Sequence, residues 1–265
     1  MHGLGGRLRV AVLAASLLVF CVVPGSAAVS GGTSDSTNAY PYVGRLELAV
    51  EGGWGGFCSG TLIQPDVVLT AAHCAWALAT GAVPPEEVRV NFNPLAHGLT
   101  PDSEALAYPA AGAAIPSGFG EPHAPAGVHV LADPWNDIAL LWLAEPVTGI
   151  APAPIAGPAY LDDRGIRDDR FTVVGYGLRG FEGSQPLLSQ GRSFRSVVLL
   201  GQAAFPERYV MISAANCGGD SGGPLLHYGT VVGITVWGND WFCRAPGMDF
   251  RVDSTIAQDF MAEYL

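Results

Sequence analysis

The sequence predicts an all-β fold built in two halves, and two observations favour this interpretation. From Tyr42 onward, short runs of β-favouring residues alternate with turn residues. The 265-residue chain also carries 35 glycines and 20 prolines, spread along it as in loop-rich proteins with many turns. About half of the residues are hydrophobic, which is enough for one large domain or two small ones with a sizeable core.

The expected strands divide at a proline-rich stretch, 145–158, which we interpret as a linker between two halves. Those before the linker span 42–48, 67–70, 88–92 and 137–143, and those after it span 171–176, 195–200, 208–212, 230–237 and 248–252. Residues 93–127 are rich in Pro, Ala and Gly, so we expect a long surface excursion that can include one buried strand piece. At the end of the chain, Ser254 is expected to cap a helix over 254–265.

The N-terminus has the layout of a secretory signal. Arg7 and Arg9 precede an apolar run, 10–23, and a small-residue stretch, 24–28. The run is shorter than the 18 or more apolar residues that a spanning helix needs. We therefore expect residues 1–28 to be a signal peptide, residues 29–265 to be a secreted extracellular domain, and no membrane association after the signal is removed.

Charge and cysteine content narrow the classes of partner. The formal charge is −11 and would fall by two units with the signal, so binding to a nucleic-acid phosphate backbone is not expected. Four cysteines would remain: Cys58, Cys74, Cys217 and Cys243. In an oxidising compartment these suggest two disulfides, and their spacing leaves all three pairings open. No His, Cys and carboxylate cluster has metal-ligand spacing, so we expect neither a metal nor another cofactor, although a stabilising calcium site stays open.

The segment 216–225 carries the clearest chemical pattern, with Ser221 flanked by glycines on both sides. A nucleophilic serine needs a tight turn that exposes its hydroxyl and lets backbone N–H groups converge on a developing oxyanion. The alternative for this segment alone is a glycine-rich turn with an incidental serine. We interpret Ser221 as a nucleophile.

A serine hydroxyl needs a base, and the base needs a third group to orient it. His73 is the candidate base, because it directly follows a β run and is next to Cys74, which would pin its turn. Asp137 is the candidate acid, because its carboxylate stands at the edge of an apolar strand and an unpaired buried charge is costly. A structural histidine and a simple strand-start aspartate are the alternatives.

Four segments resemble the signature segments of the trypsin-like (chymotrypsin-fold) serine proteases, in the family's order of His, Asp and Ser. They are 58–63, 70–74, 137–140 and 219–224. The resemblance implies two six-stranded antiparallel β-barrels of chymotrypsin type, about 29–145 and about 158–253, with the site between them and a C-terminal helix. It also implies a Cys58–Cys74 and a Cys217–Cys243 disulfide, and an oxyanion hole formed by the N–H groups of Gly219 and Ser221.

Two departures from the family stand out. Members usually expose a new terminal amine that pairs with the acid before the nucleophile, here Asp220. The nearest match to their terminal pattern is 29–32, directly after the expected signal, which predicts that signal removal itself frees the Val29 amine. Cleavage one residue earlier would put this pair in doubt.

The second departure is at Val236. The family commonly has a serine there that supports the triad aspartate, so Val236 is an internal hint of weaker activity.

The resemblance places the specificity pocket at Ala215, Trp237, Gly238 and Gly247. Ala215 supplies no acid to pair with Lys or Arg, so an apolar or aromatic preference is expected. Asp249 would lie near the pocket base in one register and Phe250 in the register one residue over. Strand alternation favours Phe250.

The expected function is that of a secreted, monomeric serine endopeptidase acting on protein or peptide substrates. One alternative is a catalytically silent or weak binding protein on the same fold. The other is an esterase that uses the same triad.

Overall fold

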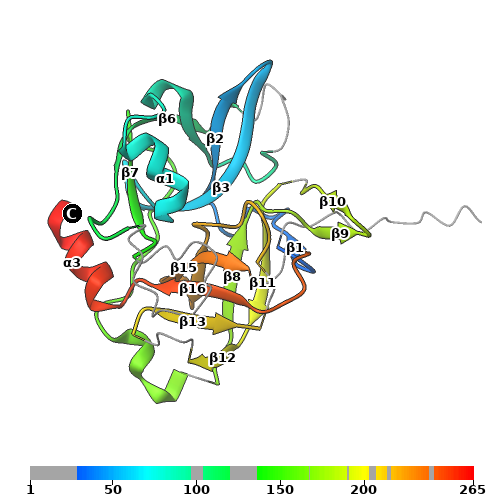
Figure 1. The fold of residues 1–265 in the computed structure, drawn as a ribbon, viewed down its shortest axis with the longest axis vertical. Helices are drawn as coiled ribbons and strands as arrows, with labels where there is room; N and C mark the ends of the chain where they lie inside the picture. Colours follow the sequence, from blue (N-terminus) through cyan, green and yellow to red (C-terminus); the bar gives the residue numbers. More distant parts are fainter. Residues whose placement is uncertain are drawn as a thin grey trace, which may run out of the picture.

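The computed structural model describes residues 29–96, 104–119, 136–166, 168–189, 191–202, 207–213, 216–238 and 242–265. The expected signal peptide therefore lies outside the described residues. Figure 1 shows two β-rich halves stacked on one another, with the C-terminal helix along one side. Within the described part of the chain, no helix is long and apolar enough to span a membrane.

The first half is a closed barrel with the strand order β2-β3-β4-β7-β6-β5, all neighbours being antiparallel. Its strands are β2 (Val43–Val50), β3 (Gly53–Gln64), β4 (Val67–Thr70), β5 (Val88–Asn91), β6 (Ala107–Ala114) and β7 (Ala139–Leu143). The turn between β2 and β3 uses Gly52 and Gly53, both with positive φ that a side chain disfavours. Because the closed barrel has no unpaired strand edge, the half that carries His73 and Asp137 is held rigid.

The strand piece that was allowed for within residues 93–127 is β6 (Ala107–Ala114). It pairs with both β5 and β7, so this part of the segment is one of the six strands that close the barrel. The parts of the segment at 97–103 and 120–127 lie outside the described residues.

The second half is an eight-stranded sheet in the order β1-β11-β8-β14-β15-β16-β13-β12. Its strands are β1 (Thr33–Ser34), β8 (Phe171–Gly175), β11 (Ser193–Val197), β12 (Leu199–Gln202), β13 (Tyr209–Ile212), β14 (Pro224–His227), β15 (Thr230–Gly238) and β16 (Gly247–Arg251). The hairpin β9 (Gly180–Glu182) and β10 (Gln185–Leu187) stands apart from it. The all-β class and the six-stranded first barrel are confirmed, whereas the second half has eight strands because the short strand β1 and strand β12 extend its ends.

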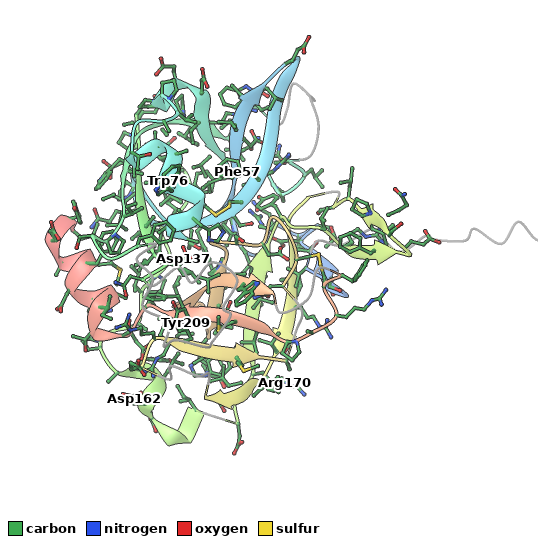
Figure 2. The ribbon with its side chains drawn as sticks, viewed as in Figure 1. Phe57, Trp76, Asp137, Asp162, Arg170 and Tyr209 are labelled. Carbon is green, nitrogen blue, oxygen red and sulfur yellow. A yellow bond between two sulfur atoms is a disulfide. The ribbon has the colours of Figure 1, made fainter. Side chains whose placement is uncertain are left out.

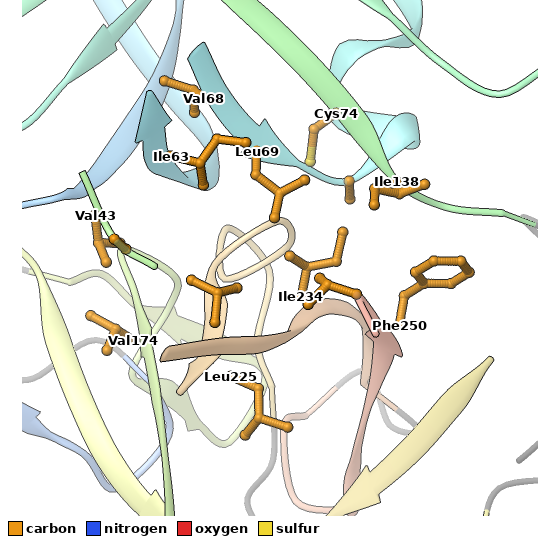
Figure 3. Close-up of a cluster of buried hydrophobic side chains, with 14 of the residues drawn as sticks. Val43, Ile63, Val68, Leu69, Cys74, Ile138, Val174, Leu225, Ile234 and Phe250 are labelled. Carbon is orange, nitrogen blue, oxygen red and sulfur yellow. The ribbon is translucent and has the colours of Figure 1, made fainter. Parts of the chain in front are cut away.

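One hydrophobic cluster runs through both halves. Figure 3 shows side chains of the first barrel facing those of the second sheet, among them Leu69 opposite Ile234. Fully burying one such side chain contributes about 1.5–3 kcal/mol. This shared core holds the two halves together next to the candidate site.

Buried Arg192 ties the N-terminal segment to both halves. Its guanidinium Nε donates to Asp35 Oδ2 at 2.7 Å, and its Nη1 donates to the Val43 carbonyl oxygen at 2.8 Å. Since β1 also pairs with β11, the segment that follows Val29 belongs to the second sheet, although the sequence division put it with the first barrel.

Helix α3 (Thr255–Tyr264) ends the chain as predicted. The Ser254 hydroxyl caps it by accepting a hydrogen bond from the Ala257 N–H at 3.3 Å. Its Tyr264 ring lies 5.7 Å from the Trp142 ring on β7, so the last helix contacts the first barrel. The described elements also include three short 3-10 helices: Pro85–Glu87, Tyr160–Asp162 and Arg164–Ile166.

Candidate active site

His73 lies in the first turn of helix α1 (Ala72–Ala79), where the sequence suggested only a turn. The N-cap residue, Ala71, has no side chain that can accept from the exposed N–H groups of this turn. Asp137 supplies the acceptor instead: its Oδ1 accepts from the His73 backbone N–H at 2.9 Å. One carboxylate therefore fixes both the start of the helix and the residue that the helix presents.

The same carboxylate orients the imidazole. Asp137 Oδ2 lies 2.7 Å from His73 Nδ1, and because an ionised carboxylate only accepts, Nδ1 carries the proton. That leaves Nε2 as the acceptor nitrogen on a side chain that is about one third exposed, while Asp137 is fully buried. Figure 2 shows Asp137 beside helix α1, where the two halves meet. This is the arrangement of a positioned general base.

Ser221 lies in a turn whose glycines are required by their surroundings. Gly219 and Gly222 have φ of 96° and 79°, and a Cβ on Gly222 would come within 2.0 Å of Thr70 Oγ1. The Asp220 and Gly223 N–H groups donate to the Cys217 and Asp220 carbonyl oxygens, which closes the turn tightly. The pattern of glycines in the sequence thus reflects close packing against the first barrel.

Contacts between the halves bring the Ser221 turn to the His73 helix. The Ser59 N–H on β3 donates to the Ser221 carbonyl oxygen at 2.8 Å, and Cys74 Sγ lies 3.7 Å from the same oxygen. The structure joins Cys58 to Cys74 and Cys217 to Cys243, the pairing that the family resemblance implied. The first disulfide links β3 to α1, and the second links the nucleophile turn to the segment that precedes β16.

Asp220 is buried behind Ser221. Its Oδ1 accepts from the Gly177 N–H at 2.8 Å and its Oδ2 from the Cys217 N–H at 3.1 Å. Burial raises the pKa of this carboxyl to about 7, and none of the described residues gives it a cationic partner. The Val29 side chain is also buried, within the main hydrophobic cluster.

The expected specificity residues are partly described. Ala215 lies outside the described residues, Trp237 and Gly238 end β15, and Gly247 begins β16 opposite Gly238. A Cβ on Gly238 would lie 2.5 Å from the Asn216 carbonyl oxygen, and one on Gly247 would lie 2.4 Å from Asn216 Nδ2. The two glycines therefore make room for Asn216, a residue that sequence reasoning missed.

The register of β16 directs Asp249, not Phe250, towards Asn216. Asn216 Nδ2 lies 3.4 Å from Asp249 Oδ1, while the Phe250 ring packs 5.4 Å from the Tyr209 ring. The preference for Phe250 at this place was wrong, because β16 is buried along most of its length and alternation then carries little information. Burial raises the pKa of Asp249 to about 7, against hydrogen bonds from Thr235 and Asn216 that lower it.

Among the His, Cys, Asp and Glu side chains of the described part of the chain, a single group of three lies close enough together to hold a metal ion. The one group of three potential ligands there comprises His73 with Cys58 and Cys74. Both cysteines are joined in a disulfide, so neither offers a thiolate.

Comparison with known proteins places these features in a family. The family model described as Trypsin matches residues 29–261. A vitellin-degrading protease from Bombyx mori is 30% identical over 198 residues, which cover 68% of this chain and 66% of that protein, just under two thirds of its length. Trypsin, alkaline C, from Manduca sexta is 27% identical over 276 residues, covering 93% and 95%.

Solved structures agree on the fold. Human heparin binding protein aligns with a TM-score of 0.66 at 20% identity, covering 89% of this chain and 96% of that one. At this identity the likeness establishes the chymotrypsin fold alone.

Proposed function

Because this chain belongs to the trypsin family of serine endopeptidases, we propose that it hydrolyses peptide bonds with His73, Asp137 and Ser221 as its catalytic triad. The observation that carries the proposal is the pair of hydrogen bonds from His73 to one buried carboxylate, beside a glycine-rich turn that holds Ser221. Peptides and proteins would be the substrates, and the enzyme would act outside the cell after loss of residues 1–28.

In the first half-reaction, His73 Nε2 takes the proton of the Ser221 hydroxyl while Oγ bonds to the substrate carbonyl carbon. Asp137 stabilises the resulting imidazolium. The C–N bond then breaks as His73 returns the proton to the leaving amine, which leaves an acyl-enzyme. A water molecule, deprotonated by His73 in the same way, releases the acid and restores Ser221.

The carbonyl oxygen becomes an oxyanion during both attacks, and the N–H groups of Gly219 and Ser221 are its proposed donors. A donor of this kind is worth about 3 kcal/mol of transition-state stabilisation. The positive φ of Gly219 supports this role, because the main chain there adopts a conformation that few other residues would hold.

The side chain before the scissile bond would enter beside Trp237, Gly238 and Gly247, next to Ala215. We propose an apolar or aromatic preference while Asp249 is protonated. Asp249 is fully buried and faces Asn216 and Thr235, and the charge of Asp220 opposes its ionisation. As the pH rises through about 7, its negative charge would favour Arg or Lys instead.

A fluorophosphonate probe tests the triad. It should label Ser221 covalently, and Ser221→Ala should fold, lose the label and lose turnover by several orders of magnitude. Retained label, or undiminished cleavage of a peptide library by this variant, contradicts the assignment. Turnover of small esters without cleavage of any peptide favours the esterase, and an unlabelled, folded wild type favours the silent binding protein.

A further inference from the structure

A cavity of about 700 Å³ is lined in part by Gly219, one of the proposed oxyanion donors. Its walls include Phe57 and Cys58 from β3, and Leu178 and Gly219 from the second half. Neither Trp237, Gly238 nor Gly247 is part of this wall. In Figure 1, β3 and the β9–β10 hairpin, after which Leu188 lies, are on the same side of the molecule. A volume of this size fits typical ligand sites.

Among the described residues that line the cavity, the one cationic group is the guanidinium of Arg45 on β2. Gly56 also lines the cavity, and a Cβ built on it would come within 1.7 Å of Arg45 Nε. The missing side chain at Gly56 is therefore what lets the guanidinium lie along this wall. The Arg45 side chain is 18% exposed, so it is largely dehydrated and yet reachable from the cavity.

Arg45 is only partly neutralised by its neighbours. Its Nη1 donates to the Ala96 carbonyl oxygen at 2.5 Å and lies 3.4 Å from Glu47 Oε1. Glu47 is closer to Arg89, whose Nε donates to it at 2.6 Å, and Arg89 is paired with Glu104 as well. Among the described residues, Arg45 thus makes one hydrogen bond although a guanidinium offers five N–H donors.

A carboxylate in the cavity would relieve an electrostatic cost. Burial lowers the pKa of Arg45, which means that the folded protein pays to keep the guanidinium charged there. The rim is apolar, with Leu188 72% and Phe57 37% exposed, so it suits the stem of a side chain whose end is charged.

Resting on the proposed function, we propose that this cavity is a subsite for an acidic side chain on the leaving-group side of the scissile bond. The acyl part of the substrate lies towards Trp237 and Gly238, and the oxyanion lies at Gly219. The chain that follows the scissile bond must then continue towards Phe57 and Leu178. A Glu or Asp side chain in this part would reach the Arg45 guanidinium.

The test uses peptides with a fixed sequence before the cut and either Glu or Gln at each of the three positions after it. At one of these positions Glu should give kcat/KM about tenfold higher than Gln, as expected for a charge-assisted hydrogen bond. An ionic strength of about 0.15 M keeps the repulsion from distant acidic residues screened. Each variant is referred to its own turnover of an aminocoumarin substrate that has no residue after the cut, so a loss of folded enzyme cancels.

Arg45→Gln should bring the Glu to Gln ratio close to one, and Arg45→Lys should keep part of it. Because the Arg45 side chain is largely buried and its replacement affects Glu47, a second pair of variants leaves the buried ions untouched. Leu188→Glu, on the exposed rim, should lower the ratio by repulsion, whereas the matched Leu188→Gln should keep it.

A second measurement works without turnover. Tripeptide amides that correspond to the leaving fragment, with Glu or Gln, are titrated into the wild-type protein by calorimetry. Tighter binding of the Glu fragment, lost in Arg45→Gln, supports the subsite even if no peptide is cleaved and the proposed function fails. Equal kcat/KM and equal binding for Glu and Gln at all three positions, or a ratio that Arg45→Gln and Leu188→Glu leave unchanged, overturns the proposal.

Discussion

On the first-barrel side of the site, the buried Asp137 carboxylate takes two hydrogen bonds from His73, whereas on the second-sheet side Asp220 and Asp249 are buried without a cation among the described residues. The Asp137 carboxylate is therefore hydrogen-bonded to the residue that it orients. The charges of Asp220 and Asp249 depend on what is added: a terminal amine, a substrate side chain or a proton. We therefore propose that the first barrel supplies the general base, and we expect Asp220 and Asp249 in the second sheet to respond to processing, substrate and pH.

The largest expected effect concerns Asp220. If removal of residues 1–28 frees the Val29 amine, that amine should pair with Asp220 and order the turn that carries Gly219. A chain that keeps one residue before Val29, and Asp220→Asn in the processed chain, should each lose kcat by about 10²–10³-fold, the value of one oxyanion donor. Terminal sequencing of the secreted protein identifies the species, and peptide kinetics measure the loss. An active form that begins well before Val29 would contradict this pairing.

Asp249 should give a smaller, pH-dependent effect on stability. Its pKa in the folded protein is raised from 3.8 to about 7, so between these values the folded state holds a proton that the unfolded state has lost. Stability must then fall as the pH rises from about 4 to about 7. Asp249→Asn, which keeps the shape, should flatten the change in melting temperature between pH 5 and pH 8.

Asp249→Asn also distinguishes Asp249 from Asp220, whose pKa is likewise raised to about 7, through its effect on substrate specificity. In the wild type, the kcat/KM ratio of Arg to Phe before the cut should rise about tenfold from pH 6 to pH 8, because ionised Asp249 attracts a cation. In Asp249→Asn the ratio should stay level, while any contribution from Asp220 remains. A ratio that changes equally in both proteins would remove Asp249 from the specificity pocket.

The sequence could predict those parts of the fold that local pattern determines. The β-branched run 67–70 and the apolar run 139–143 became β4 and β7, and Ser254 caps α3 as expected. The residues proposed as the triad come from short motifs and their order along the chain, with the segments of Ser221 and His73 more distinctive than that of Asp137. Local spacing was sufficient there, since a turn such as that at Ser221 is defined by its own glycines.

Strands and contacts that depend on pairing partners could not be predicted in this way. β3 has four glycines and β6 five alanines, which are poor strand formers, and only pairing with neighbours on both sides makes them strands. Asn216 and Asp249 are 33 residues apart, and Arg45 reaches the cavity only because Gly56 on the next strand leaves space. No periodicity in one segment reports such contacts, and the alternation rule fails for β16 because it is buried on both faces.

The smallest expected effect is a gain, and it tests whether the support of Asp137 is complete. Val236 stands at a shift in register between β15 and β16, where an irregular strand can redirect a side chain. Its neighbour Thr235 exchanges hydrogen bonds with the nucleophile turn: the Gly222 N–H donates to the Thr235 carbonyl oxygen, and the Thr235 N–H donates to that of Gly223. A hydroxyl at position 236 is thus expected to lie close to the triad.

Val236→Ser should raise kcat by a few-fold, because the added hydroxyl would donate to the Asp137 carboxylate and so help it to stabilise the imidazolium of His73 in the transition state. The matched control, Val236→Ala, removes the same apolar contacts without adding a donor. It should therefore lower the stability of the protein without raising kcat. Stopped assays on one peptide substrate, with thermal unfolding of all three proteins, measure both effects. If Val236→Ser and Val236→Ala give the same kcat, then the two hydrogen bonds with His73 are enough to hold Asp137. In that case the first barrel positions its carboxylate without help from the second sheet, whereas Asp220 and Asp249 still depend on processing, substrate and pH.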